Sequence, residues 1–168
     1  NGWIDSVKKQ RPIDSNGNPL PWLSYPFIDF IAERIKPEFN IFEFGAGNST
    51  LYFAPKVNSV YSVENDKDWF ETLSKILPKN ATVVYEPDLK SGAYAKQINN
   101  PSQKFELILV DGRDRVNCCK AGFNHLTSSG VLVLDNSDRI EYKGAFDFFV
   151  EKGFKQLSFW GTAPGYID

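Results

Sequence analysis

A turn of small residues follows the first apolar run of the chain and could bring a ligand close to the backbone. The run Phe42-Glu43-Phe44 leads into Gly45-Ala46-Gly47, and glycines let a chain turn sharply with no Cβ in the way of a bound molecule. Glu64 ends the next apolar run, 19 residues after Gly45. This separation is expected for a carboxylate that accepts hydrogen bonds from ribose hydroxyls. The pattern favours a nucleoside-containing ligand, and a glycine-rich turn without a ligand is the alternative.

Two details of this turn separate a cationic ligand from a dinucleotide. Thr50 stands where the dinucleotide-binding pattern has its third glycine, which that pattern needs for close packing of helix and strand. Glu43 places a carboxylate directly before the turn, where it would repel a pyrophosphate and attract a positive charge. We therefore expect a sulfonium cofactor rather than a nicotinamide or flavin dinucleotide.

A second set of polar residues follows two later apolar runs. Asp111 comes directly after residues 105–110, and Asp135 and Asn136 come directly after residues 131–134. If both runs are parallel strands, these side chains lie at the sheet edge that also carries the glycine turn. Three hard oxygen donors are ligands that Mg²⁺ accepts while it keeps several waters, so the set is a candidate metal site. A turn that closes the strand is the alternative for Asp135 and Asn136.

Three arginines follow the same two runs: Arg113, Arg115 and Arg139. Forked guanidinium groups match carboxylates and phosphates, so these residues could form a pocket for an anionic acceptor. The alternative is salt bridges to the nearby acids Asp114, Asp138 and Glu141.

Three segments together resemble the class I S-adenosylmethionine-dependent methyltransferases: Glu43–Ser49, Ser62–Glu64 and Val110–Gly112. The resemblance covers roughly residues 22–136. It implies that the glycine turn passes beneath the methionine part of S-adenosylmethionine and that Glu64 binds the ribose. Asp88 would contact the adenine or, alternatively, close a turn. The residues that the resemblance assigns to the cofactor are Glu43, Gly45, Ala46, Gly47, Asn48, Ser49, Glu64, Asn65, Asp88 and Asp111.

The spacing of Asp111, Asp135 and Asn136 is similar to that in the catechol-type O-methyltransferases. In that family a divalent metal such as Mg²⁺ lowers the pKa of the acceptor hydroxyl. The resemblance implies that Asp111 and Asp135 are catalytic and that a small-molecule acceptor is methylated at oxygen. The family's catalytic lysine would fall near Arg113, and arginine does not release its proton in proteins. Asp111 or the metal would then activate the acceptor; the alternative function is a catalytically degenerate methyltransferase-like binding or interaction module.

These side chains need alternating strands and helices to bring them together. Apolar runs of strand length occupy residues 40–44, 59–63, 82–85, 105–110, 131–134 and 154–160. Helical periodicity appears between them, over residues 22–35, after Asp66, over 116–126 and over 142–152. In the second of these helices Trp69, Leu73, Ile76 and Leu77 share a face. The alternation predicts a single-domain α/β fold: a doubly wound, Rossmann-like, mostly parallel sheet with helices on both faces.

The chain divides into two predicted parts. Residues 1–21 are rich in Pro, Gly and Asn, and we expect an N-terminal arm or lid without regular structure. Residues 22–168 form the methyltransferase-like domain. Residues 161–168 leave room for a turn but hardly for another strand, so the C-terminal hairpin typical of the family is expected to be incomplete.

Composition narrows the classes of partner. The 168 residues carry 19 basic and 21 acidic side chains, a formal charge of −2, which argues against nucleic-acid binding. The longest apolar runs are too short for a membrane span. The two cysteines, Cys118 and Cys119, are adjacent and give no disulfide framework, so a reduced cytoplasmic protein with a small-molecule substrate is expected.

Overall fold

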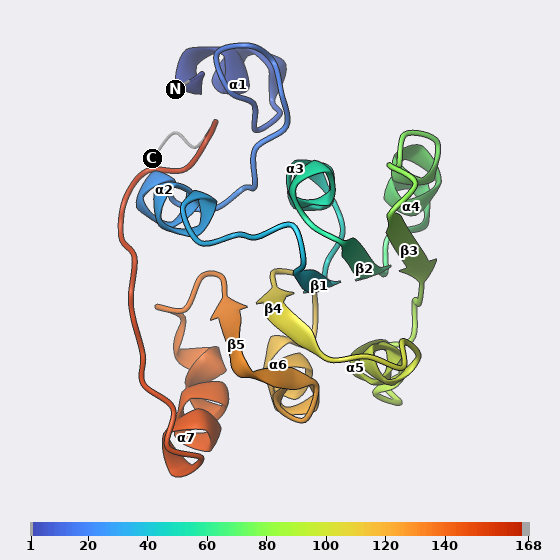
Figure 1. Ribbon diagram of the computed structural model, residues 1–168, viewed down its shortest axis with the longest axis vertical. Helices are drawn as coiled ribbons and strands as arrows, with labels where there is room; N and C mark the ends of the chain where they lie inside the picture. Colours follow the sequence, from blue (N-terminus) through green and yellow to red (C-terminus); the bar gives the residue numbers. More distant parts are fainter. Residues whose placement is uncertain (1, 166–168) are drawn as a thin grey trace.

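The computed structural model describes residues 2–165 and contains one parallel sheet between two layers of helices (Figure 1). The strand order is β3-β2-β1-β4-β5, and each neighbouring pair runs parallel. The strands are β1 (Asn40–Phe44), β2 (Ser59–Glu64), β3 (Ala81–Tyr85), β4 (Phe105–Val110) and β5 (Leu126–Leu134). The chain winds outward from β1 to β3 and then returns to add β4 and β5 on the other side of β1. This order confirms the predicted doubly wound α/β fold.

Helices α2, α3 and α4 cover one face of the sheet, and α5, α6 and α7 cover the other (Figure 1). The α-helices are α1 (Trp3–Lys9), α2 (Tyr25–Ala32), α3 (Asn48–Phe53), α4 (Lys67–Ser74), α5 (Ala93–Lys96), α6 (Arg115–Phe123) and α7 (Lys143–Glu151). Short 3-10 turns are η1 (Ala54–Lys56), η2 (Gln97–Asn99) and η3 (Ile140–Tyr142). None of the helices within residues 2–165 has the length and apolar character that a membrane crossing requires.

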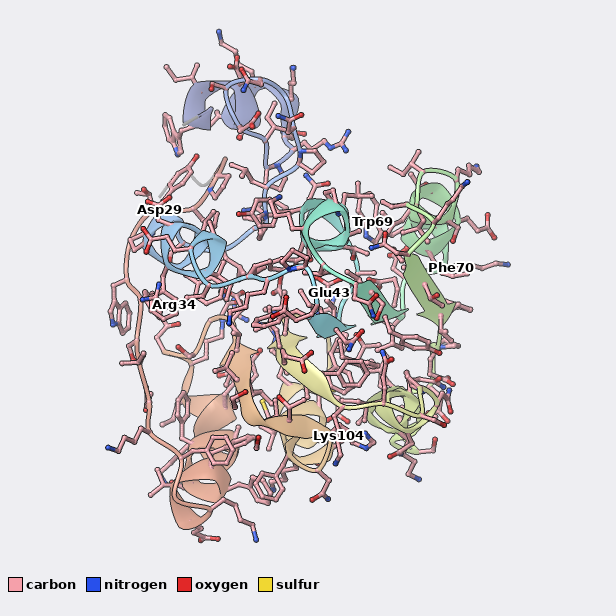
Figure 2. The ribbon with its side chains drawn as sticks, in the orientation of Figure 1. Asp29, Arg34, Glu43, Trp69, Phe70 and Lys104 are labelled. Carbon is pink, nitrogen blue, oxygen red and sulfur yellow. The ribbon has the colours of Figure 1, made fainter. Side chains whose placement is uncertain are left out.

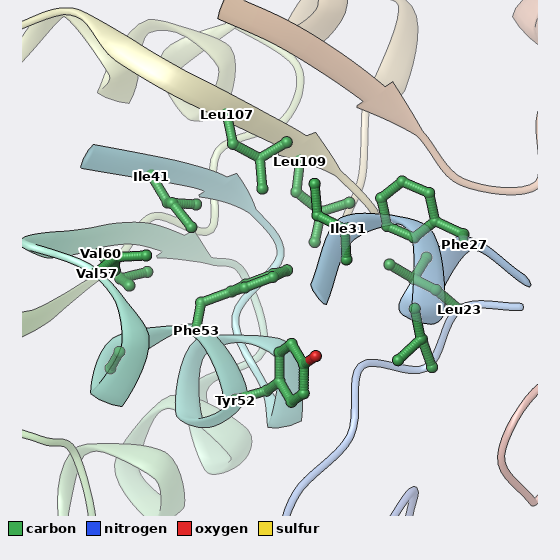
Figure 3. Close-up of a cluster of buried hydrophobic side chains, with 12 residues drawn as sticks. Leu23, Phe27, Ile31, Ile41, Tyr52, Phe53, Val57, Val60, Leu107 and Leu109 are labelled. Carbon is green, nitrogen blue, oxygen red and sulfur yellow. The ribbon is translucent and has the colours of Figure 1, made fainter. Parts of the chain in front are cut away.

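The two faces of the sheet carry separate hydrophobic cores because successive strand residues point in opposite directions. On the first face, Ile41 and Leu109 pack with Phe27 of α2 and Phe53 of α3 (Figure 3). On the second face, Phe42, Phe44 and Ile108 pack with residues of α5, α6 and α7. The strands are therefore fixed from both sides, and so are the positions of their carboxyl ends.

The end of α6 and the start of β5 differ from the sequence prediction. The helix ends at Phe123, and the strand begins at Leu126 rather than Val131. Phe105 pairs with Leu126, and the register shifts before Leu107 pairs with Val131. Gly130 lies in this irregular part of the strand, where a Cβ would come within 2.7 Å of the Phe105 carbonyl oxygen. Pairing with β4 therefore overrides the turn-forming residues of this stretch.

The predicted strand at residues 154–160 does not form. This segment runs past α7 toward α2 without regular secondary structure (Figure 1). The Phe159 ring packs against the rings of Phe27 and Phe30, with centroid distances of 5.5 and 4.7 Å. The backbone nitrogen of Tyr25 donates to the Thr162 carbonyl oxygen at 2.9 Å. Aromatic packing on α2 thus holds the segment, and within residues 2–165 the sheet has five strands rather than six.

The N-terminal arm contains regular structure, contrary to the sequence prediction. Residues 3–9 form α1, and the Ser6 hydroxyl anchors this helix by donating to the Ile13 carbonyl oxygen at 2.9 Å.

The predicted apolar face that begins in α4 is only partly buried. Of its residues Leu73 is buried, whereas Trp69 and Ile76 are 41% and 54% exposed. The Trp69 ring lies beside the glycine turn instead of in the core, because its indole nitrogen donates to the Ala46 carbonyl oxygen.

Candidate active site

The ends of β1, β2 and β4 are tied together around the glycine turn. The backbone nitrogen of Gly45 donates to the Val63 carbonyl oxygen at 2.9 Å. The backbone nitrogen of Gly112 donates to the Phe44 carbonyl oxygen at 2.6 Å. Gly45 has a φ of +99°, and a Cβ on it would lie 2.8 Å from the Gly112 nitrogen. A Cβ on Gly112 would collide with the Tyr94 hydroxyl. Only glycine fits at both positions, so the ends of β1 and β4 can pack backbone against backbone.

Glu43 is fully buried and supports the glycine turn from behind. Its Oε2 accepts hydrogen bonds from the hydroxyls of Thr50 and Ser62, at 2.5 and 2.7 Å. Thr50 Oγ1 also accepts a hydrogen bond from the backbone nitrogen of Gly47 at 3.0 Å. Burial raises the pKa of Glu43, and the hydrogen bonds from Thr50, Ser49 and Ser62 oppose that rise. Its Oε1 has no hydrogen-bond partner within the described residues, which leaves one buried acceptor oxygen beside the turn.

Glu64 fixes the other side of the turn. Its Oε2 accepts a hydrogen bond from the Ala46 nitrogen at 3.1 Å, and its Oε1 accepts from the nitrogens of Asn65 and Asp66 at 2.7 and 2.8 Å. The carboxylate lies at the carboxyl end of β2, as the sequence predicts for a ribose-binding acid. Oε1 uses both of its lone pairs in these contacts, whereas Oε2 retains one for a ligand hydroxyl.

Trp69 covers the turn and was not among the predicted site residues. Asp66 begins α4 by accepting a hydrogen bond from the Trp69 nitrogen at 2.9 Å, which confirms the predicted helix start. The Trp69 indole nitrogen then donates to the Ala46 carbonyl oxygen at 2.8 Å, and its ring lies 3.8 Å from a Cβ built on Gly47. Its side chain reaches from α4 toward α3, while Glu43 projects from β1 (Figure 2). Helical periodicity assigned Trp69 to the core, so only the Asp66 cap pointed to its position near the turn.

Three further predicted cofactor residues border the turn. The Asn48 amide nitrogen donates to the Pro12 carbonyl oxygen at 2.6 Å, so it faces the N-terminal arm. Ser49 lies in the first turn of α3, and Asn65 is half-buried next to Glu64. The arm therefore contacts the glycine-turn side of the site.

Asp88 lies in the turn before α5. Its Oδ1 accepts hydrogen bonds from the nitrogens of Lys90 and Ser91 at 2.9 and 3.0 Å, and its Oδ2 accepts from the Ser91 hydroxyl. These hydrogen bonds, that of the Ser91 hydroxyl first, lower the pKa of Asp88. The geometry matches the alternative that Asp88 closes a turn.

Arg115 joins the ends of β4 and β5. Its Nη2 donates to Asp111 Oδ1 at 3.0 Å, and its Nη1 lies 3.4 Å from Asp135 Oδ2 and 3.2 Å from Asn136 Oδ1. The sheet thus brings together the three residues predicted at these strand ends. The sequence suggested other acids as arginine partners: Asp114, Asp138 and Glu141. The structure pairs Arg115 instead with Asp111, four residues before it, and with Asp135, the residue after β5.

The two carboxylates of this cluster influence each other. Partial burial raises the pKa of Asp111 well above its usual range, and the charge of Asp135 raises it further. Arg115 acts in the opposite direction. Asp111 therefore holds a proton more readily than a surface carboxyl does, and such a carboxyl can exchange a proton with a bound molecule.

The predicted metal ligands do not fit a divalent cation as they are arranged. Asp111, Asp135 and Asn136 each direct a side-chain oxygen to the Arg115 guanidinium. Within residues 2–165, no group of three His, Cys, Asp or Glu side chains is placed to hold a metal ion. A metal would have to displace a guanidinium whose side chain is 10% exposed.

A groove of about 1020 Å³ opens beside the acid pair. Asp111 and Asp135 line it at the strand ends, and aromatic side chains line it elsewhere, among them Phe30 of α2, Phe146 of α7 and Trp160 of the C-terminal segment. The volume lies at the upper end of the range for small-molecule sites. The groove can therefore hold a sizeable, largely apolar molecule with its polar group at the carboxylates.

Comparison with solved structures shows where this fold occurs. The chain is similar to precorrin 8w decarboxylase of Methanobacterium thermoautotrophicum, with a TM-score of 0.65 and 17% identity over 85% of this chain and 78% of that one. It is also similar to the precorrin-6y C5,15-methyltransferase of Geobacter metallireducens GS-15 (TM-score 0.59, 14% identity, 89% and 80% covered). A third similar structure is the MycE methyltransferase of mycinamycin biosynthesis in complex with Mg and SAH. Its TM-score is 0.56 and its identity is 18%, over 84% of this chain and 41% of that one.

The fold defined by these structures is the Rossmann-like fold of class I methyltransferases, and this chain has it. No protein-family model matches the chain, and no curated protein sequence matches it significantly.

Proposed function

We propose that this protein transfers a methyl group from S-adenosylmethionine to a small-molecule acceptor at oxygen. One observation carries the proposal: the glycine turn and the acid-lined groove meet at the β4 end, where Gly112 packs against Gly45 and Asp111 lines the groove. A cofactor on the turn and an acceptor in the groove would then face each other. The methyltransferase fold supports this arrangement.

The residues around the turn suit the cofactor. The cofactor would lie along the backbone of the glycine turn, and Glu64 Oε2 would accept a hydrogen bond from the ribose. Oε1 of Glu43 is buried behind the turn and has no hydrogen-bond partner among the described residues; when Glu43 is ionised, its charge would favour a cation on the turn. When bound, the cofactor supplies an electrophilic methyl group on a positive sulfur, and its transfer leaves a neutral thioether.

The acid pair would manage the acceptor proton. The acceptor oxygen forms a bond to the methyl carbon and loses its hydrogen, and the deprotonated member of the Asp111–Asp135 pair accepts that proton. The guanidinium of Arg115 holds both carboxylates in place during this step. Positioning the two reactants in line supplies most of the rate enhancement, in favourable cases about 7–11 kcal/mol.

A second candidate is a cofactor-binding domain without turnover, and the same arginine favours it. Because Arg115 already pairs with both carboxylates, the acids could serve structure alone. The two functions separate in one assay. The protein is incubated with S-adenosylmethionine and a panel of apolar hydroxyl compounds, and release of the demethylated product is measured. Turnover that Asp135→Asn abolishes supports the enzyme, whereas cofactor binding without turnover across the panel supports the binding domain.

A further inference from the structure

Arg115 uses all three nitrogens of its guanidinium within the candidate site. Besides the side-chain contacts to Asp111, Asp135 and Asn136, its Nε donates to the Gly112 carbonyl oxygen at 3.0 Å. Nη1 and Nη2 donate to the carbonyl oxygens of Asp135 and Asp111, at 2.6 and 2.7 Å. The backbones of both strand ends are therefore bound, as well as the carboxylates.

The surroundings of Arg115 keep it in this position. It is the first residue of α6, and Asp111 precedes it by four residues. The guanidinium carbon lies 5.5 Å from the centre of the Tyr142 ring, within the range of a cation–π contact. Arginine remains charged at all physiological pH values, so the cation is permanent.

The charge of the cluster can be satisfied in two ways. Two carboxylates and an amide oxygen suit a divalent cation, as the sequence suggests, or a planar guanidinium. Both cannot occupy the centre together, because a dication placed beside a fixed guanidinium is repelled by it and finds its ligand oxygens already engaged.

We propose that Arg115 is the resident cation of this site, filling the place of a divalent metal and making the site independent of metal ions. In this arrangement Arg115 is a positioning residue: it joins the ends of β4 and β5 and orients Asp111 and Asp135 toward the groove. The inference rests on the hydrogen-bond geometry and holds whether or not the site transfers methyl groups.

Removing the guanidinium leaves three oxygen ligands with no cation among them. Arg115→Ala should therefore acquire a divalent metal site that the wild-type protein lacks. The added Asp135→Asn substitution should remove it again, because it replaces a charged ligand.

Mn²⁺ binding tests this directly, by the electron paramagnetic resonance signal of the free ion in titrations of each variant. Wild type should leave millimolar Mn²⁺ free, and Arg115→Ala should bind it at least tenfold more tightly, with a Kd of about 0.1 mM or below. Arg113→Ala is the matched control, since Arg113 is exposed and two residues away: it removes the same charge and should gain no site.

Circular dichroism establishes that each variant is folded. If Arg115→Ala does not fold, Arg115→Gln takes its place, because glutamine preserves more of the side-chain volume. Wild-type protein that binds Mn²⁺ as tightly as the variant, through Asp135, would overturn the inference. So would a folded variant that binds no Mn²⁺. These outcomes are independent of methyl transfer, so a failed activity assay does not affect them.

Discussion

The strand order reverses between β1 and β4, and the polar residues on the two sides of that point are held by different contacts. On the β1–β2 side, Glu64 is held by three backbone nitrogens, and Glu43 is held by two hydroxyls. On the β4–β5 side, the side chain of Arg115 contacts both Asp111 and Asp135, and the two carboxyl groups also hydrogen-bond to each other. The acids of the cofactor side are thus held by several backbone and hydroxyl donors, whereas Arg115 makes most of the contacts that hold the acids of the acceptor side.

Burial differs in the same direction. Residues of β1 and β2 beside the turn are almost fully buried, as in Phe44 and Val63 at 0% exposure. On β5 and in the segment after α7, large apolar side chains remain at the surface, including Val131 at 49%, Leu157 at 73% and Trp160 at 72%. A common cofactor needs one unchanging site, and an acceptor groove can differ from protein to protein, so this difference is consistent with the proposed division of labour.

The largest expected effect concerns the acid pair. Asp135→Asn should lower the rate of methyl transfer by about 10²–10⁴-fold, the usual contribution of a general base. It should leave the affinity for the demethylated cofactor within about threefold, because Asp135 lies on the acceptor side. Steady-state kinetics and calorimetry measure the two quantities. Asp138→Asn is the matched control, and equal losses in both variants would break the assigned roles.

The next effect tests how closely the cofactor side is packed. Gly45→Ala should destabilise the protein by about 2–4 kcal/mol, because it adds a backbone collision to a left-handed conformation. Gly92 has a φ of +76° but open space around it, so Gly92→Ala should cost only about 1–2 kcal/mol. Urea denaturation compares the two. Equal costs would show that the approach of Gly45 to Gly112 is not tight.

A pH dependence follows from the buried carboxyl of Glu43. Its pKa in the folded protein is raised above the ordinary value of 4.5, so its contribution to stability is complete below that value. The contribution is lost as pH rises through the raised folded pKa. Glu43→Gln removes this titration, and its free energy of unfolding should fall less over the same interval. Denaturation at a series of pH values measures this, with the exposed Glu38→Gln as control; identical profiles for Glu43→Gln and wild type would contradict it.

The smallest effect is expected at the exposed aromatic lining of the groove. Trp160→Ala should change stability by no more than about 0.5 kcal/mol, because the side chain is 72% exposed. Once an acceptor is found, its KM should rise several-fold. Ile4→Ala on α1, also largely exposed and away from the groove, should leave KM unchanged. An equal rise of KM in both variants would show that Trp160 does not contribute to acceptor binding.

The sequence predicts the centre of the sheet better than its edge. The ends of β1 and β4 match the apolar runs because both strands are buried on two faces and bounded by polar or glycine residues. β5 begins five residues earlier than predicted, within Leu126-Thr-Ser-Ser-Gly, because pairing with β4 outweighs local turn propensity. The segment at 154–160 has strand-like composition, but Phe159 finds a better apolar surface on α2.

The candidate site shows the same limit. Glycines and acids at strand ends are readable from sequence because the fold places strand ends together. The role of Arg115 was not readable, since one of its partners lies four residues away and the other lies 20 residues away across the sheet. Trp69 was not predicted as a site residue because helical periodicity shows which face of a helix a residue lies on. It does not show that the first turn of this face extends past the core to the glycine turn.

Calorimetric titration with S-adenosylhomocysteine, the demethylated cofactor, tests the central claim most directly. The account predicts binding at one site per chain in the micromolar range, and a loss of at least tenfold in affinity for Glu64→Gln. The exposed Glu71→Gln on α4 serves as control and should bind like wild type. Absence of binding by folded wild-type protein up to millimolar ligand would contradict the account.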